Sequence, residues 1–225
     1  MAHPGRASTY TEWLDPAIVD EHDPTRRDAS LDLFNPENGP PFSADFLDCY
    51  RAAQLARTRR ITAWVRDRLN YAAKTGRREY ADLPFVVHGT CADPRFVDLS
   101  IDPSDREAGT LWGETIVANN LPATLGHFTS MRSWLSQWSF DDSQCNAVRH
   151  LPSVTVSVLV VYGTADSAAL PHHARESYDA APTGRRKLVA LAGATHYFAG
   201  QPGHLEHAAD EIVSWLADEH LAAAS

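Results

Sequence analysis

The alternation of apolar and polar residues is most regular after Pro152. The stretch 154–162 is a continuous apolar, β-branched run, which predicts a strand buried on both faces. Helical spacing follows over 171–181, then a second apolar run over 187–191 and an amphipathic helix over 203–222. This order of strand, helix, strand and helix predicts two parallel strands joined by a right-handed crossover.

The first part of the chain has a weaker pattern. Residues 1–42 are rich in proline, aspartate and asparagine, which predicts loops with short helices at 13–19 and 30–34. From residue 43 the apolar side chains recur at helical spacing, so we expect one or two helices over 44–74. Ser43 is a suitable N-cap for them, and Gly76 is a natural stop. Their arginines are predicted to be solvated, with a specific anion site as the alternative: Arg51, Arg57, Arg59, Arg60, Arg66 and Arg68.

The segment between this helical region and Pro152 shows only short elements. PFVVHGT, residues 84–90, is predicted to be a short strand, and 91–126 to be mostly loop. SMRSWLSQWS, residues 130–139, is predicted to be helical, with tryptophans that pack.

Composition narrows the possible partners. The chain has 225 residues, 44% of them hydrophobic, which suits one soluble domain with or without a small lid. A net charge of −9 argues against nucleic acid and anionic membranes as partners. No apolar run approaches the roughly 20 residues that a membrane-spanning helix needs, and the N-terminal residues lack an apolar signal core. We therefore expect a cytoplasmic protein with no membrane association.

The spacing of the cysteines and histidines does not match that of the ligands in common metal sites. The three cysteines are odd in number and lack a CxxC pair, which argues against a disulfide framework or a zinc cage: Cys49, Cys91 and Cys145. His172-His173 and the HxxH of His204 and His207 are the nearest to ligand spacing, but no cysteine or acid completes either set at a typical spacing. We expect surface histidines, no metal site and no cofactor.

Two residues with catalytic potential follow the two predicted strands. Asp166 comes after the first strand and His196 after the second. Since the carboxyl ends of neighbouring parallel strands meet at one edge of a sheet, these side chains could form a pair there. A carboxylate bonded to one imidazole nitrogen fixes the tautomer and leaves the other nitrogen free to accept a proton from a nucleophile.

This pattern resembles a known family. VLVVYGTAD followed by GATHYFAGQP, within residues 150–221, looks like the C-terminal third of an α/β-hydrolase. On that resemblance Asp166 corresponds to the acid of a Ser-His-Asp triad and His196 to its general base. The alternative is that Asp166 caps a turn and His196 only pairs with it.

The nucleophile that this family requires is missing from the sequence. It should stand at the centre of a G-x-S-x-G turn between a strand and a helix. The only glycines with that spacing are Gly109 and Gly113 of GTLWG, and Leu111 stands between them. The G-x-D-x-G frame of dehalogenase-like and epoxide-hydrolase-like relatives is absent as well.

Cys91 is the one alternative nucleophile that the chain order allows. VVHGTCAD places it after an apolar run and before Asp166 and His196, and a thiolate is a competent nucleophile. Pro94 follows closely, however, where a nucleophile turn must open into a helix. The other reading is that Cys91 is a small apolar residue.

The resemblance as a whole implies a partial α/β-hydrolase fold, made of the last parallel strands with flanking helices plus a large, mostly helical lid. MAHPGRA resembles the loop that leaves the sixth strand of that fold. Residues 1–150 would then be a lid or cap region, and 151–225 the C-terminal core segment with the acid and the histidine. On this interpretation the chain is truncated, mis-started or naturally split.

The implied activity is hydrolysis of an ester, thioester or amide in a small-molecule acyl substrate, with the chain inactive by itself. The alternatives are an inactive remnant, a binding partner or a Cys91-dependent hydrolase. A partial sheet also predicts self-association through its exposed edge. Six aromatic residues of the lid region could line an acyl pocket or form the core of the lid: Trp64, Phe85, Trp112, Phe128, Trp134 and Trp138.

Overall fold

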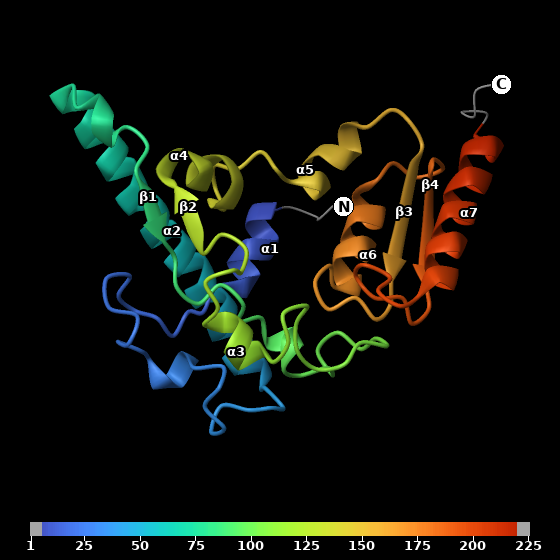
Figure 1. Cartoon of the computed structure of the whole chain (residues 1–225), viewed down its shortest axis with the longest axis horizontal. Helices are drawn as coiled ribbons and strands as arrows, with labels where there is room; N and C mark the ends of the chain where they lie inside the picture. Colours follow the sequence, from blue (N-terminus) through green and yellow to red (C-terminus); the bar gives the residue numbers. More distant parts are fainter. Residues whose placement is uncertain (1–5, 220–225) are drawn as a thin grey trace. The chain divides into compact units, whose positions relative to one another are not determined.

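The computed structural model describes residues 6–219, which form two compact units (Figure 1). The N-terminal unit consists of 6–101 and 108–146, and the C-terminal unit of 102–107 and 147–219. Both contain helices and short strands, so the protein is of the mixed α/β class. The division at residue 146 lies near the predicted boundary at 150, but the segment 102–107 belongs to the C-terminal unit. MAHPGRA lies mostly outside the described residues.

The C-terminal unit is built around two parallel strands. The sheet pairs β3 with β4 in parallel, Val158 opposite Arg186 and Gly163 opposite Leu191, which confirms the predicted parallel pairing. Its elements in chain order are α5 (Ala147–His150), the 3-10 turn η5 (Leu151–Ser153), β3 (Val158–Gly163), α6 (Pro171–Ala180), β4 (Arg186–Leu191) and α7 (Pro202–Asp218). The last residues of the predicted final helix, 220–222, lie outside the described part of the chain.

The prediction of a strand buried on both faces is wrong. β3 begins at Val158 rather than at 154, and its first five residues are only half-buried. In Figure 1, α6 lies beside β3 and α7 beside β4, with the strands between the two helices. Within the described residues no third strand pairs with β3, so one long edge of this apolar strand stays open.

The segment 102–107 anchors the start of α6. Asp102 accepts hydrogen bonds from the backbone N–H of His172 (3.3 Å), contacts His172 Nδ1 (3.0 Å) and forms an ion pair with Arg175. Burial alone would raise the pKa of Asp102, but His172 and Arg175 outweigh it and hold the pKa below its ordinary value. His173, in the same turn, is only 2% exposed. The prediction that these two histidines are exposed on the surface is therefore wrong: His173 is buried, and His172 is half-buried beside Asp102.

The N-terminal unit is organised around one long helix. Its elements are α1 (Arg6–Trp13), η1 (Ala29–Leu31), α2 (Ala44–Thr75), η2 (Arg78–Tyr80), β1 (Pro84–Val86), η3 (Pro94–Phe96), α3 (Thr115–Asn119), β2 (Phe128–Ser130), α4 (Met131–Ser133) and the π turn η4 (Trp134–Trp138). β1 and β2 pair antiparallel. The strand predicted over 84–90 ends at Val86, and Gly89, with a positive φ of 62°, could not have continued it.

Helix α2 confirms the predicted start and stop. The Ser43 hydroxyl accepts the Phe46 N–H (3.1 Å), and Gly76 ends the helix in the left-handed conformation. The helix runs unbroken for 32 residues. Across residues 6–219, however, no helix combines the length and the apolar character that crossing a membrane requires.

The two short helices predicted in the N-terminal loops are wrong. Trp13 ends α1, and the buried Asp15 then accepts the Ala17 N–H (3.1 Å), which turns the chain away from a helix over 13–19. At 30–34 there is only the three-residue turn η1, where Asp28 accepts the Ser30 N–H (2.9 Å). In both places a local aspartate hydrogen bond replaces helix propagation.

The aromatic residues of this unit are divided between core and surface. Trp134 and Trp138 are buried around Tyr10, with Trp134 Nε1 donating to Thr62 Oγ1 (2.9 Å). Trp64 and Phe85 pack against that core and also line a hollow of about 500 Å³. By contrast, Phe128 is 69% exposed. The tryptophans over 130–139 thus pack as predicted.

The arginines of α2 are not uniformly solvated. Arg59 is exposed beside Asp141, and Arg60 and Arg66 are exposed as well, as predicted. Arg57 is 1% exposed and hydrogen-bonded within the unit, so the prediction is wrong for this residue. The bidentate ion pair with Glu21 makes its burial tolerable.

Candidate active site

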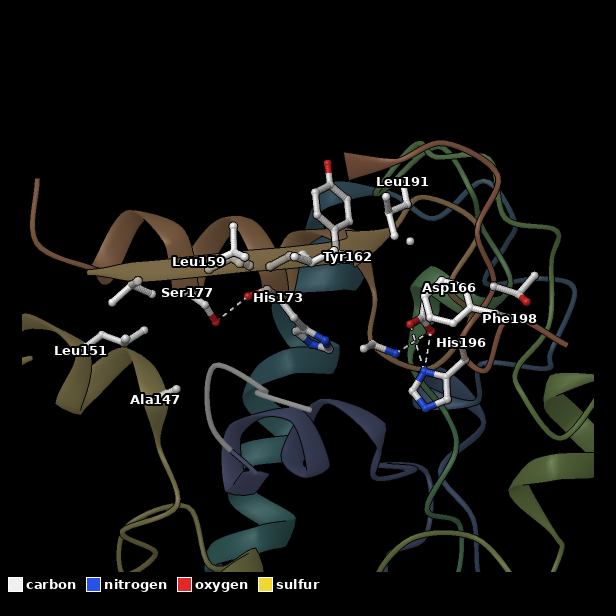
Figure 2. A pocket seen from close by; sticks show the side chains of 17 residues that line it. Ala147, Leu151, Leu159, Tyr162, Asp166, His173, Ser177, Leu191, His196 and Phe198 are labelled. Atoms are coloured by element: carbon white, nitrogen blue, oxygen red, sulfur yellow. Dashed lines mark hydrogen bonds and ion pairs between the residues drawn. The ribbon is translucent and has the colours of Figure 1, made fainter. Parts of the chain in front are cut away.

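Asp166 and His196 meet beyond the carboxyl ends of the two parallel strands. His196 Nδ1 lies 3.0 Å from Asp166 Oδ1 and 2.9 Å from Oδ2, and both side chains are almost fully buried (Figure 2). Asp166 Oδ1 also accepts the backbone N–H groups of Ala168 and Ala169, each at 2.8 Å. These bonds fix the carboxylate against the ring. The predicted proximity is confirmed, whereas the catalytic roles stay a prediction.

The orientation of this pair defines which nitrogen of His196 can act. An ionised carboxylate only accepts hydrogen bonds, so a neutral imidazole beside it carries its proton on Nδ1. Nε2 then keeps its lone pair. In the described part of the chain, no hydrogen bond involves Nε2 of His196. The arrangement can therefore accept a proton at Nε2 and hold the resulting imidazolium against Asp166.

Gln201 braces the loop that carries His196. Its Oε1 accepts both the backbone N–H and the hydroxyl of Thr195 (2.9 Å each), and its Nε2 donates to the Gly193 carbonyl (2.8 Å). Gln201, which follows His196 in the chain, is thereby bonded to two residues that precede it. Sequence reasoning missed Gln201, because a polar residue before a helix carries no signal of the loop it will bond.

Asp105 connects the acid loop to the histidine loop. Its backbone N–H donates to the Thr164 carbonyl (3.1 Å), and its side chain accepts from the Thr164 hydroxyl and from the Gly193 N–H (3.2 Å). Thr164 follows β3 and Gly193 follows β4. Asp105 thus holds the two strand ends together, although it lies far from both in sequence. Nothing in the sequence pattern marks it.

Gly163 allows the acid loop and the histidine loop to approach each other. A Cβ at this position would lie 2.2 Å from the Ala194 carbonyl oxygen, a distance that no real contact reaches. The same carbonyl accepts the Ala165 N–H (3.1 Å), so it cannot move without breaking a bond of the acid loop. Glycine at the end of β3 is therefore required for the spacing of Asp166 and His196.

We expect Gly163→Ala to separate the two loops. The forced overlap should cost about 1–3 kcal/mol or more in the free energy of unfolding, since the clashing atom belongs to the backbone. The histidine ring resonances should shift as the Nδ1 bond to Asp166 lengthens. Gly203→Ala is the matched control, because a Cβ there meets no atom within 4 Å. Equal unfolding curves for the two variants would contradict this account of Gly163.

A groove of about 410 Å³ leads along β3 to the Asp166–His196 pair (Figure 2). All six residues of β3 line it. Ala147 and Leu151 form part of its wall, as do residues of α6 and, near the pair, Leu191 and Phe198. The groove is mostly apolar, and one end of it is formed by Asp166 and His196.

The alternative nucleophile lies in an unsuitable environment. Cys91 belongs to the N-terminal unit and is completely buried, and this burial raises the pKa of its thiol to about 12. The thiolate is therefore scarce at neutral pH, which does not favour nucleophilic attack. In GTLWG, Gly113 and Thr110 pair in a tight turn, so this motif does not form a strand-to-helix elbow.

Comparison of the chain with protein-family models, with curated proteins and with solved structures finds no match.

Proposed function

We propose that Asp166 and His196 are the orienting acid and the general base of a hydrolase that cleaves an ester, thioester or amide bond. The observation that supports this most directly is the contact of His196 Nδ1 with both Asp166 oxygens, at 3.0 and 2.9 Å. It lies at the carboxyl edge of two parallel strands, where catalytic groups gather in sheets of this kind. The pair also opens onto a groove in which a substrate or a nucleophile can approach.

The nucleophilic hydroxyl comes, in this proposal, from residues outside these 225, because the sequence contains no G-x-S-x-G turn. Nε2 of His196 takes the hydroxyl proton while the oxygen bonds to the acyl carbon. The imidazolium then gives that proton to the departing alcohol, thiol or amine. In the second half, water gives a proton to Nε2 and attacks the acyl carbon. The bond from that carbon to the nucleophile's oxygen then breaks, the imidazolium returns the proton to this oxygen, and the carboxylic acid leaves.

The second candidate is that the pair has a structural role in a protein that only binds a partner. Asp166 Oδ1 caps the following turn through Ala168 and Ala169, and this alone would justify a buried aspartate. The open edge of β3 would then be a binding surface without chemistry. The two candidates differ in whether His196 Nε2 ever accepts a proton from a nucleophile.

The deciding experiment measures hydrolysis of p-nitrophenyl acetate and labelling by a serine-directed phosphonate. The 225-residue chain alone should do no better than free histidine and should resist the label. Coexpression with the segment encoded on the 5′ side of Met1, fused or separate, should produce both activities if that segment contains a strand and G-x-S-x-G. The His196→Ala variant should lose them, and His207→Ala, an exposed control on α7, should keep them.

Two results would contradict the proposal. Phosphonate labelling of the chain by itself, lost on replacing one of its own serines, would show that the nucleophile lies within these residues. Absence of hydrolysis after coexpression, or hydrolysis that the His196→Ala variant retains in full, would favour the structural role.

A further inference from the structure

Arg68 differs from the other arginines of α2. Each of those forms an ion pair with a carboxylate: Arg51, Arg57, Arg59, Arg60 and Arg66. Within residues 6–219 no carboxylate pairs with Arg68, although the chain contains 29 acidic residues against 20 lysines and arginines. The exposed guanidinium lies instead 5.7 Å from the centre of the Trp64 ring. Its N–H donors are therefore available to an anion from outside the chain.

Arg68 lines a second hollow of the N-terminal unit, about 520 Å³ in volume, which we call the Arg68 hollow. It is formed by the C-terminal half of α2, the turn η2, the start of β1 and the start of α4. Its uncharged lining consists of Trp64, Tyr71, Tyr80, Leu83, Pro84 and Met131. Its charged lining consists of Arg68 and Arg77, and no acidic residue of the described chain belongs to it. The hollow is thus large enough for a small molecule and is positively charged.

Both arginines of the hollow are stacked on aromatic rings. Arg68 lies over Trp64, and Arg77 lies over Tyr80 at 4.6 Å from the ring centre. A guanidinium packed on a ring face keeps the N–H groups along its edge for hydrogen bonds, and their geometry matches a carboxylate or a phosphate. Arg77 also pairs with Glu79 (3.0 Å), but both side chains are about half-exposed, so this pair contributes little. An anion in the hollow would therefore bond to Arg68 and be attracted by Arg77.

The same hollow offers a surface for a flat ring. Tyr71 is 53% exposed and follows Arg68 by three residues, which places the two side chains on one face of α2. Leu83, Pro84 and Met131 add apolar surface. An aliphatic anion would use only the arginines, and a neutral ring would use only the aromatic and apolar side chains. A ligand that combines an aromatic ring with an anionic group would use both parts of the lining.

We propose that the Arg68 hollow binds a small planar aromatic anion, with its carboxylate or phosphate bonded to Arg68 and its ring packed against Tyr71. Such binding is independent of Asp166 and His196, because every lining residue belongs to the N-terminal unit. A net charge of −9 disfavours a long polyanion such as RNA, whereas a single anionic group meets chiefly the local charge of the two arginines. Of the arginines in α2, Arg68 is thus the one to which the alternative of a specific anion site applies.

The test uses anthranilate, a fluorescent aromatic carboxylate, as the probe for the purified chain. Its fluorescence should report saturable binding at submillimolar probe, and added salt should weaken that binding because the hollow is open to solvent. Benzoate and phenyl phosphate should displace the probe, and their relative strength shows which anionic group Arg68 prefers. Cyclohexanecarboxylate lacks the aromatic ring and benzyl alcohol lacks the charge, so each should displace the probe at least about tenfold more weakly than benzoate does.

Matched variants separate binding in the hollow from attraction by net charge. Arg68→Gln should weaken anthranilate binding by about tenfold or more. Arg66→Gln makes the same change in charge at an exposed position of the same helix outside the hollow, and should bind as the wild type does. Arg68→Lys should fall between the two, because lysine keeps the charge without the planar fork. Tyr71→Ala should weaken binding of benzoate while leaving that of cyclohexanecarboxylate unchanged.

Several outcomes would overturn the inference. Equal displacement by benzoate and benzyl alcohol would show that the hollow selects rings without regard to charge. Equal affinities of Arg68→Gln and Arg66→Gln would show that net charge, and not the hollow, attracts the probe. Binding of single-stranded oligouridylate more tightly than phenyl phosphate, lost in Arg68→Gln, would identify a nucleic-acid surface. Absence of saturable binding at millimolar anthranilate, with circular dichroism showing a folded protein, would show that no such site exists.

Discussion

Under the proposed function, Asp166→Asn is expected to lower turnover by about 10⁴-fold. The asparagine amide would donate to Nδ1 of His196, where the aspartate accepts from it. The imidazole proton would then move to Nε2, the nitrogen that must accept the proton of the nucleophile. Asparagine also keeps one oxygen to accept the Ala168 N–H, so the loop should remain folded.

The measurement is the pH profile of kcat and kcat/KM, together with thermal unfolding. The loss should appear in kcat, since the variant changes proton transfer and leaves the substrate groove intact. Asp210→Asn makes the same chemical change at an exposed position of α7 and should have wild-type kinetics. Equal turnover of the Asp166 variant and the wild type would remove the catalytic role from the pair.

The fold around this pair could be predicted because its signals are local. Apolar runs, helical spacing and the order of elements predicted β3, α6, β4 and α7 closely. Parallel pairing of the two strands followed from the crossover, and the contact between Asp166 and His196 followed from the pairing. These predictions depend only on residues of one element or of elements that follow one another closely in the chain.

The supports of the site could not be predicted, because they depend on contacts between distant segments. Asp105 is separated from Thr164 and Gly193 by most of a unit, and no periodicity connects them. Gln201 bonds a loop whose shape is set by tertiary packing. Residue type and spacing predicted the Asp166–His196 contact, whereas the side chains that position it appear only in three dimensions.

The wrong prediction for β3 is informative in a different way. Its sequence predicts a strand buried on both faces, yet the first five of its residues are half-buried, and no described strand pairs with one of its edges. A sequence pattern reports the environment that a strand is suited to. In the described structure β3 is apolar in sequence but only partly covered.

The prediction that Arg57 is solvated was wrong because it relied on the type of residue and not on its position along the helix. Along α2 the buried residues Tyr50, Gln54, Ile61 and Val65 recur at helical spacing, and position 57 falls within that stripe. Its charge suggested a solvated face. The structure instead satisfies the guanidinium with backbone carbonyls and a carboxylate, so the spacing was the better guide.

Arg57→Ala is expected to lower the free energy of unfolding by about 3–5 kcal/mol, because it breaks a buried charge pair from one side. The guanidinium donates to both Glu21 oxygens (2.9 and 2.7 Å) and to the carbonyls of Asp15 and His88 (2.8 Å each). Burial alone would raise the pKa of Glu21, and Arg57 is the largest influence that lowers it. Alanine would leave that carboxylate with only Arg60, and the His88 carbonyl would lose its donor.

Urea unfolding of the purified chain checks this expectation, with Arg59→Ala as the control on the same helix. Arg59 pairs with Asp141 in solvent, so its loss should not change the unfolding midpoint measurably. Arg57→Lys retains the charge but cannot reproduce the paired bonds to Glu21, so it should fall between the wild type and Arg57→Ala. If Arg57→Ala and Arg59→Ala unfold at the same urea concentration, the buried network contributes nothing to stability, and the long helix is held by its apolar contacts alone.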